Sequence, residues 1–301
     1  MAWIFRQLYI RGESEFRKGM RELGYNNGYI YGYIEMLKEK ATEIRKSIVT
    51  MINKANSGHP GGSLSIADIL SVLYFHEMKI NPENPKDLNR DRFVLSKGHA
   101  SPAIYATLAE RGYFSKDLLP TFRKYGSILQ GHPDMKKVPG VDMSTGSLGQ
   151  GLSVANGMAQ SAKISNQDYR TYVIMGDGEV QEGQVWEAAM TSAHYKLDNV
   201  CAILDSNNLQ IDGNVDKVMG VEPLDKKWEA FGWNVIKVDG HDYESIIEGL
   251  NKAKECKGKP SILIAKTVKG KGVSFMENNG GWHGVAPTAE ETEKALAELN
   301  R

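Results

Sequence analysis

The sequence has little cysteine, no net charge and no long apolar run, and each absence excludes a class of protein. Its 301 residues hold two cysteines, too few for a disulfide scaffold or a CxxC metal site. The 37 basic and 37 acidic side chains balance, which argues against nucleic acid as a partner. No run approaches 18 apolar residues, and Arg6 and Arg11 interrupt the apolar N-terminus, so we expect neither a membrane span nor a signal peptide. We therefore expect a soluble, cytoplasmic protein.

The first 35 residues differ from the rest of the chain. They are rich in tyrosine and glycine and show no clean helical or strand period. One interpretation is that translation starts later than assigned, at Met20 or Met36. The other is a genuine extension that packs on a partner. We treat 1–35 as an N-terminal extension and 36–301 as one domain, since no linker-like composition divides the latter.

From residue 36 onward, the spacing of apolar residues predicts strands that alternate with helices. The predicted strands are 93–95, 171–175, 200–205, 234–238 and 262–268. The predicted helices are 36–55, 66–78, 102–110, 152–164, 182–196, 224–231 and 243–254. Strands alternating with helices of this length indicate right-handed βαβ units. The fold class is therefore α/β, with a parallel sheet flanked by helices.

The strongest local signal is a pair of polar turns after two neighbouring predicted strands. A Gly-Asp-Gly turn at 176–178 ends one strand, and Asp205, Asn207 and Asn208 end the next. Because the intervening helix makes these strands parallel neighbours, both ends open at one edge of the sheet, where open α/β sheets bind ligands. Either turn alone would indicate only a loop, but the pair indicates a shared binding site.

The residue types at this edge predict a metal ion and a diphosphate. Asp177 offers a carboxylate oxygen, Asn207 an amide oxygen, and the loop after Asn207 carbonyl oxygens, all hard ligands suited to Mg²⁺ or Ca²⁺. Gly176 and Gly178 allow the backbone to approach phosphates closely. The helix that begins near Glu182 directs its positive end toward the same edge, which favours an anion.

These residues resemble a known family. GDGEVQEG at 176–183, followed by SNN at 206–208, resembles the diphosphate motif of thiamine-diphosphate enzymes. Further motifs resemble those of transketolases, in the same order: SGHPGG (57–62), SKGHA (96–100), QGHPD (130–134) and STGSLGQGLSVANG (144–157). The resemblance covers about 37–290 and implies a thiamine-diphosphate-binding fold.

The resemblance also implies roles for individual residues. Asp177, Asn207 and the backbone oxygen of Leu209 match ligands of Mg²⁺, for which Ca²⁺ or Mn²⁺ can substitute. Residues matching thiamine diphosphate contacts are His99, Gly146, Leu148, Gly176, Asp177, Gly178, Glu179, Asn207 and His283. Catalytic roles are implied for His59, His99, His132 and His283, and for Glu182 in a proton-linked network between two active sites. Imidazole suits such work because it exchanges protons near neutral pH.

Other polar residues receive structural interpretations. His76 and His194 lie inside predicted helices and are assigned to the structure alone. His241, in the motif DGHD, is a loop residue with no matched role. Asp68 and Asp142 are interpreted as helix caps or loop residues.

Two local departures from the family are visible. Glu179 stands where full-length members often carry cysteine. GGWHGVAP at 280–287 holds one histidine, where many relatives have two.

A larger departure is the length of the chain. Transketolases are more than twice as long, and their second domain binds the aminopyrimidine of the cofactor and carries the glutamate that activates it. Only about thirty residues follow Val268. The resemblance therefore implies the N-terminal subunit of a split transketolase, inactive alone. It would form an α₂β₂ assembly with a C-terminal subunit that carries the pyrimidine-binding domain.

The expected activity is the transfer of a two-carbon ketol unit between sugar phosphates, as in the pentose phosphate pathway. One alternative is another thiamine-diphosphate chemistry, in the α subunit of a 2-oxo-acid dehydrogenase or a fragment similar to deoxyxylulose-phosphate synthase. The other is a diphosphate-binding protein without catalysis. The histidines of SGHPGG and GHPD favour ketose transfer, because a 2-oxo-acid enzyme needs no such set. The identity of the ketose stays open.

Overall fold

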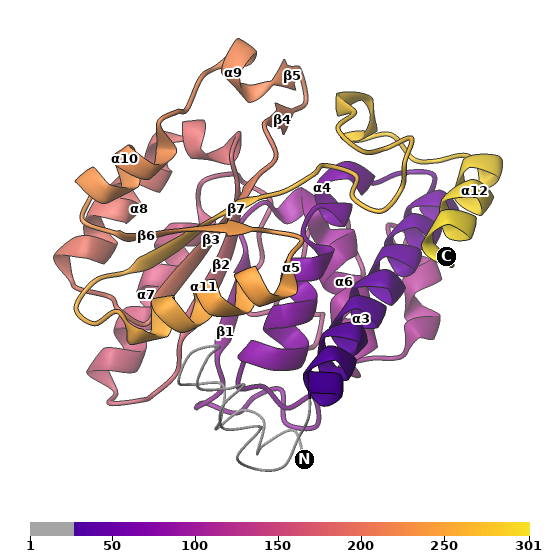
Figure 1. Ribbon diagram of the computed structural model, residues 1–301. Helices are drawn as coiled ribbons and strands as arrows, with labels where there is room; N and C mark the ends of the chain where they lie inside the picture. Colours follow the sequence, from indigo (N-terminus) through magenta and orange to yellow (C-terminus); the bar gives the residue numbers. More distant parts are fainter. Residues whose placement is uncertain (1–26) are drawn as a thin grey trace.

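The centre of the molecule is a five-stranded parallel sheet (Figure 1). The computed structural model describes the backbone of residues 27–301 and the side chains of residues 32–301. The strands run in the order β1-β2-β3-β7-β6, and every neighbouring pair is parallel. Their bounds are β1 Arg92–Leu95, β2 Thr171–Gly176, β3 Val200–Ser206, β6 Asn234–Asp239 and β7 Ser261–Lys266. The predicted fold class is confirmed.

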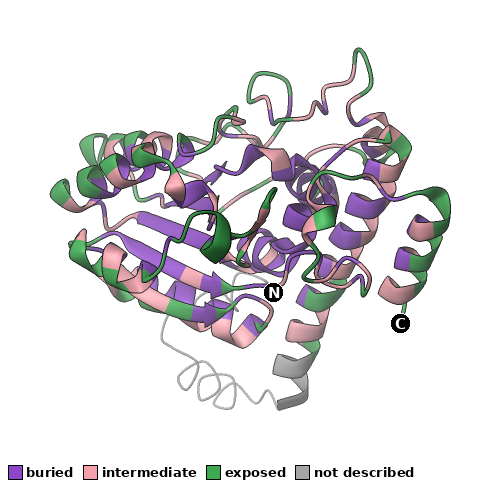
Figure 2. Cartoon of the chain, turned by 90° about the horizontal axis from the view of Figure 1, so that it is seen from above, coloured by how far each residue is buried: buried purple, intermediate pink, exposed green. Residues whose placement is uncertain are grey.

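Helices cover both faces of the sheet, so its inner strands are apolar on both sides. Along β2, Tyr172 and Ile174 pack into one buried cluster, while Val173 and Met175 pack into the other. The first cluster lies under α3, α5, α6 and α11, and the second under α7, α8 and α10. Figure 2 shows the buried strands between these two layers. This two-sided burial explains why TYVIM and VCAILD read as continuous apolar runs.

The α-helices have the following bounds: α3 Asn27–Ala55, α4 Pro60–Leu64, α5 Ala67–Val72, α6 Ser101–Arg111, α7 Gly151–Ile164, α8 Gly183–His194, α9 Val215–Val218, α10 Leu224–Ala230, α11 Tyr243–Glu255 and α12 Ala289–Leu299. A π-helical turn at Leu73–Glu77 continues α5. A short antiparallel pair, β4 Leu209–Gln210 and β5 Gly213–Asn214, lies outside the main sheet. Within the described residues, no helix combines the length and the apolar character that crossing a membrane requires.

The predicted strands and helices are confirmed to within a few residues at most ends, with one larger difference. The first helix begins at Asn27 rather than at residue 36, so α3 extends into the tyrosine-rich segment that shows no clear period. Residues 1–26 lie outside the described residues, so neither interpretation of the extension 1–35 is tested.

The sequence-based prediction also missed α4, the β4–β5 pair, α9 and α12. The loop predicted at 57–63 contains α4, which is too short to show a period. The β4–β5 pair is equally short. α12 has a readable signal, because Thr288 and Glu291 form a capping box at its start.

Candidate active site

A cavity of about 350 Å³ opens at the carboxyl ends of β2, β3 and β7. Of the residues predicted from the sequence, those that line it are His59, His99, Gly146, Leu148, Gly176, Asp177, Gly178, Glu179, Glu182, Asn207, Leu209 and His283. His132 is not among the lining residues but lies directly behind Gly146, where an added Cβ would come within 3.1 Å of its ring. The structure thus brings together motifs that span more than two hundred residues of sequence.

The predicted metal ligands come from the ends of β2 and β3. One carboxylate oxygen of Asp177 accepts the Gly178 amide at 2.8 Å, and the other accepts the Asn208 amide. The amide oxygen of Asn207 accepts the Leu209 amide at 3.0 Å. A carboxylate, an amide oxygen and a carbonyl are the kinds of ligand that Mg²⁺ takes together with phosphate and water. The donor set therefore fits the metal predicted from the sequence.

Asp177 is electrostatically unfavourable without a cation beside it. Burial, together with the nearby charge of Asp205, raises the pKa of Asp177 to about 6. Backbone hydrogen bonds from Asn208 and Gly178 lower that pKa but do not outweigh burial. A divalent cation at this point would relieve the cost of the buried charge.

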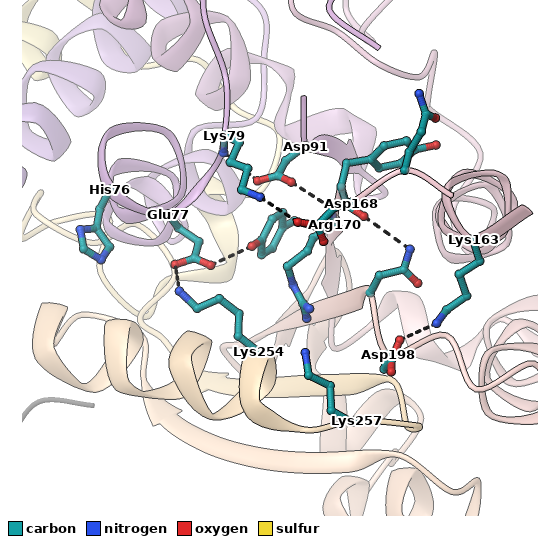
Figure 3. Close-up of a pocket in the computed structure, with 14 residues that line it drawn as sticks. His76, Glu77, Lys79, Asp91, Lys163, Asp168, Arg170, Asp198, Lys254 and Lys257 are labelled. Atoms are coloured by element: carbon teal, nitrogen blue, oxygen red, sulfur yellow. Dashed lines mark hydrogen bonds and ion pairs between the residues drawn. The ribbon is translucent and has the colours of Figure 1, made fainter. Parts of the chain in front are cut away.

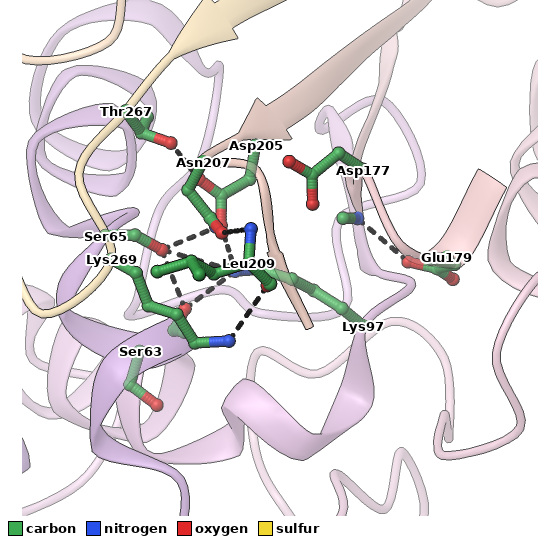
Figure 4. Close-up of polar contacts among 12 residues, drawn as sticks. Ser63, Ser65, Lys97, Asp177, Glu179, Asp205, Asn207, Leu209, Thr267 and Lys269 are labelled. Atoms are coloured by element: carbon green, nitrogen blue, oxygen red, sulfur yellow. Dashed lines mark hydrogen bonds and ion pairs between the residues drawn. The ribbon is translucent and has the colours of Figure 1, made fainter. Parts of the chain in front are cut away.

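A buried ion pair between Lys97 and Asp205 lies beside the predicted metal ligands (Figure 4). Asp205 is fully buried and accepts hydrogen bonds from Lys97 at 2.5 Å, Ser65 at 2.7 Å, Asn207 at 3.0 Å and also Thr267. Burial would raise the pKa of Asp205, but the charge and hydrogen bond of Lys97 outweigh it and lower the pKa. The Asp205 carboxylate thus connects the ends of β3 and β7 to Ser65 and to Lys97 of the SKGHA motif.

Lys269 is a site residue that the sequence analysis missed. Its ammonium group lies 3.0 Å from the carbonyl oxygen of Leu209 and 2.7 Å from Nδ1 of His283. Burial, and then the charge of Lys97, lower the pKa of Lys269 to about 8. No motif marked this residue, since VKGKG resembles any exposed lysine-rich loop. The structure adds a buried cation to the edge where a diphosphate was predicted.

Three histidine rings form a triangle in the cavity. The ring centroids are 5.2 Å apart for His59 and His99, 5.3 Å for His99 and His283, and 5.6 Å for His59 and His283. Because Lys269 donates to Nδ1 of His283, the proton of that ring is on Nε2. Nδ1 of His59 is buried and has no hydrogen-bond partner among the described residues.

All three rings are held neutral at pH 7. Burial is the largest cause in each case, and it lowers the pKa to about 4 for His59, about 2 for His99 and about 3 for His283. Arg123 adds to the effect at His59, Lys97 at His99 and Lys269 at His283. Neutral imidazoles can accept or donate protons at sugar hydroxyls, which is the chemistry expected from the sequence.

These shifts predict acid lability of the ligand-free chain. A histidine whose pKa is lowered on folding binds protons mainly in the unfolded state, so stability is full above about pH 6.5 and is lost as the pH falls. For the well-buried His99, the loss between pH 6.5 and 4.5 should be about 2 kcal/mol. Urea unfolding measured across this range tests the prediction, with His99→Gln expected to flatten the curve. An identical pH dependence in both proteins would contradict it.

The two glutamates of the GDGEVQEG motif occupy different places. Glu179 is buried, and its carboxylate accepts Ser96 Oγ at 2.5 Å, the Gly149 amide at 2.9 Å and the Gly176 amide at 3.0 Å. It therefore fixes the glycine turn relative to the 144–157 motif. Glu182 is exposed at the start of α8, on the rim of the cavity.

The interpretation of Asp68 as a helix cap or loop residue is wrong. Asp68 lies inside the first turn of α5, is buried, and takes hydrogen bonds from Arg45, His241 and Tyr243. The sequence pattern around Asp68 does not indicate this role, because the partners of Asp68 lie on distant segments of the chain. Asp142 is a loop residue as expected, where it accepts the Phe93 amide at 2.8 Å.

A second cavity, of about 390 Å³, lies at the opposite edge of the sheet, beside the amino ends of β2 and β3 (Figure 3). Three of its lysines form ion pairs with acids of the same cavity: Lys79 with Asp168 at 3.3 Å, Lys163 with Asp198 at 2.6 Å and Lys254 with Glu77 at 2.7 Å. None of the predicted site residues lines it. The candidate active site is therefore the cavity at the carboxyl edge.

Comparison with known proteins agrees with this geometry. Residues 36–300 match the family described as transketolase, thiamine diphosphate binding domain. The chain is 46% identical over 89% of its length to an apulose-4-phosphate transketolase subunit of Phocaeicola vulgatus, and the match covers 95% of that protein. It is 47% identical to a 6-deoxy-6-sulfo-D-fructose transketolase subunit of a Clostridium species, with 88% and 96% of the two chains covered.

Longer transketolases match over part of their length. The match to human transketolase is 41% identical and covers 88% of this chain but 42% of the human protein. The structure of Campylobacter jejuni transketolase superposes with a TM-score of 0.83 at 39% identity, over 88% of this chain and 43% of that one. Because the family match spans nearly all of the described residues, the chain belongs to the transketolase thiamine-diphosphate-binding domain family.

Proposed function

We propose that the chain is the diphosphate-binding subunit of a two-subunit transketolase that moves a ketol unit from a ketose phosphate to an aldose phosphate. The observation that carries this proposal is the convergence, in one cavity, of the Asp177 oxygen set, the Lys269 cation and the histidine triangle. Diphosphate, metal and sugar hydroxyls each have chemically matched groups there. We propose the cytoplasm as its compartment.

The residues of the cavity divide into three tasks. Asp177, Asn207 and the Leu209 carbonyl hold Mg²⁺, while Lys269 and the backbone around Gly178 hold the diphosphate. When bound, thiamine diphosphate supplies the nucleophilic carbon that breaks and forms carbon–carbon bonds. Other cofactor contacts are assigned to His99, Gly146, Leu148, Gly176 and His283, with Glu179 holding the glycine turn in place.

The histidines bind the sugar substrate and transfer its protons. His59, His99 and His283 bind hydroxyl groups and transfer protons at the substrate oxygens, and His132 assists from behind Gly146. In the ligand-free chain the three rings are neutral at pH 7, so each offers one donor and one acceptor to sugar hydroxyls.

A second chain completes the site in this proposal. The two relatives reported above as subunits have almost the same extent as this chain, which supports a separate C-terminal partner. The rim of the cavity carries the exposed apolar side chains Leu148 and Ile211 and the exposed Glu182. Such a rim is suited to burial against a second chain. We propose an α₂β₂ assembly in which Glu182 lies at the contact between subunits.

Reconstitution tests the function. The chain is co-purified with a candidate C-terminal subunit that carries the pyrimidine-binding domain, and cleavage of xylulose 5-phosphate is followed with ribose 5-phosphate as acceptor. We expect turnover in the mixture with Mg²⁺ and thiamine diphosphate, and none by either chain on its own. Turnover by this chain alone would contradict the need for a partner.

A panel of donors tests the substrate. Apulose 4-phosphate and 6-deoxy-6-sulfofructose appear in the names of the two relatives that are subunits, so both are assayed beside xylulose 5-phosphate. Pyruvate serves as the control for 2-oxo-acid chemistry. A complex that binds the cofactor and cleaves pyruvate but no ketose would overturn the transketolase assignment while keeping the cofactor site.

A further inference from the structure

The segment that follows β7 brings two residues of the candidate site into place. It carries Lys269 and His283, and its backbone is fixed on both sides of Lys269. The Thr267 amide donates to the Ser206 carbonyl at 3.1 Å, and the Gly270 amide donates to the Gly61 carbonyl at 3.0 Å. Between them, the Val268 amide donates to Nε2 of His241 at 2.8 Å. That side-chain contact is the third anchor of the segment.

His241 is itself held by a buried cluster. Its Nδ1 lies 2.8 Å from Asp68, which also receives Arg45 at 2.9 and 2.5 Å and the Tyr243 hydroxyl at 2.5 Å. Since an amide can only donate, Nε2 of His241 is an acceptor and the ring proton is on Nδ1, where it is donated to Asp68. The ring therefore has one orientation and one tautomer.

The Asp68 carboxylate in this cluster stays ionised. Burial alone would raise the pKa of Asp68, but the charge of Arg45 and the hydrogen bonds from His241, Arg45 and Tyr243 outweigh it and lower the pKa. Arg45 comes from α3 and Asp68 from α5, while His241 lies in the turn between β6 and α11 and Tyr243 begins α11. The cluster thus ties three parts of the scaffold to one backbone amide beside the site.

We propose that His241 is a positioning residue that sets the place of Lys269 by linking the buried Arg45–Asp68 pair to the Val268 amide. The inference rests on the proposed function, in which Lys269 binds the cofactor diphosphate. In the ligand-free structure the Lys269 ammonium contacts the Leu209 carbonyl and His283, and a group that binds a ligand needs to be held to within about 0.5 Å. On the other side of Lys269, the Gly270 amide is held by the Gly61 carbonyl at 3.0 Å.

Two substitutions of His241 test its two hydrogen bonds separately, the one to Asp68 and the one from the Val268 amide. His241→Asn keeps a donor near the position of Nδ1 for Asp68 but offers no acceptor to Val268. His241→Gln places an oxygen near the position of Nε2, where it can accept the Val268 amide. Thiamine diphosphate affinity is measured by titration of the reconstituted two-subunit complex at saturating Mg²⁺. We expect roughly tenfold weaker binding for His241→Asn and a change below about threefold for His241→Gln, since an unpaired donor is costly.

Tyr243→Phe is the matched control. It removes another donor from Asp68 without touching Val268, so it should lower the melting temperature and leave cofactor affinity unchanged. Hydrogen exchange adds a readout independent of the cofactor: the Val268 amide should exchange as slowly as the amides of β7 in the wild type and faster in His241→Asn. This wild-type measurement decides the matter even if His241→Asn folds poorly.

Specific results would overturn the inference. Equal affinities for wild type, His241→Asn and His241→Gln would do so, as would fast exchange at Val268 in the wild type. A loss of affinity in Tyr243→Phe that follows its melting temperature would indicate a general structural role. A wild-type complex that binds no thiamine diphosphate would instead contradict the proposed function.

Discussion

Replacement of Asp177 by asparagine is expected to weaken Mg²⁺-dependent binding of thiamine diphosphate by more than about 100-fold, because loss of a supporting hydrogen bond to a metal ligand alone costs about 10–100-fold. Asp177 supplies the one carboxylate among the proposed ligands, and Asn207 and Leu209 offer only neutral oxygens. Calorimetric titration of the reconstituted complex measures the change. Asp168→Asn, which removes an exposed carboxylate at the opposite edge of the sheet, is the control with the same change in charge.

The same substitution should have the opposite effect on the ligand-free chain. Because the pKa of Asp177 is raised to about 6 on folding, its ionised form destabilises the folded state, and the full cost is present above that pH. Asparagine removes the charge but loses one acceptor for the backbone amides of Gly178 and Asn208. We expect a net gain of about 1 kcal/mol at pH 7.5 that disappears near pH 4. A loss of both stability and binding would indicate a structural role only.

Replacement of Asp205 by asparagine is expected to destabilise the chain by roughly 3–5 kcal/mol, because it removes the carboxylate that is directly paired with the buried Lys97. Lys97 is 2% exposed, so water cannot take over the lost interaction. Asparagine also turns an amide donor toward a group of donors that includes Ser65, Asn207 and Thr267. Urea unfolding of the full chain at pH 7.5 measures the change.

Two controls test the explanation for Asp205. Glu248→Gln breaks the exposed pair with Lys252 and should cost less than about 0.5 kcal/mol. The double variant Lys97→Met with Asp205→Leu removes both charges and should recover a large part of the stability lost in Asp205→Asn. If the double variant were as unstable as the single one, an unpaired charge would not be the cause.

The fold was predictable because its signals are local. The runs TYVIM and VCAILD are buried on both faces of the sheet, and their apolar character is visible in the sequence without knowledge of their neighbours. The turns that carry Asp177 and Asn207 follow those runs directly. Parallel strands joined by a helix must place their carboxyl ends at the same edge, so the two turns had to meet there.

Other features depended on contacts between distant segments. Lys97 and Asp205 are 108 residues apart in sequence, and Asp68 and His241 are 173 apart. No periodicity marks Lys269, which follows β7 in an irregular segment. The first helix began earlier than predicted, since its opening turns mix tyrosine and glycine rather than repeating an apolar face. α4 was missed because five residues are too few to show a period.

The sequence by itself determined the α/β class, the predicted strands and the edge of the sheet at which the turns of Asp177 and Asn207 meet, because each follows from short-range order in apolar and polar residues. Only the tertiary structure decided which buried charges pair, which lysine enters the cavity and which loop histidine supports it. The physical reason is that a buried polar group must find a partner wherever the folded chain brings one close. That partner is determined by the packing of the folded chain and cannot be read from the spacing of residues along the sequence.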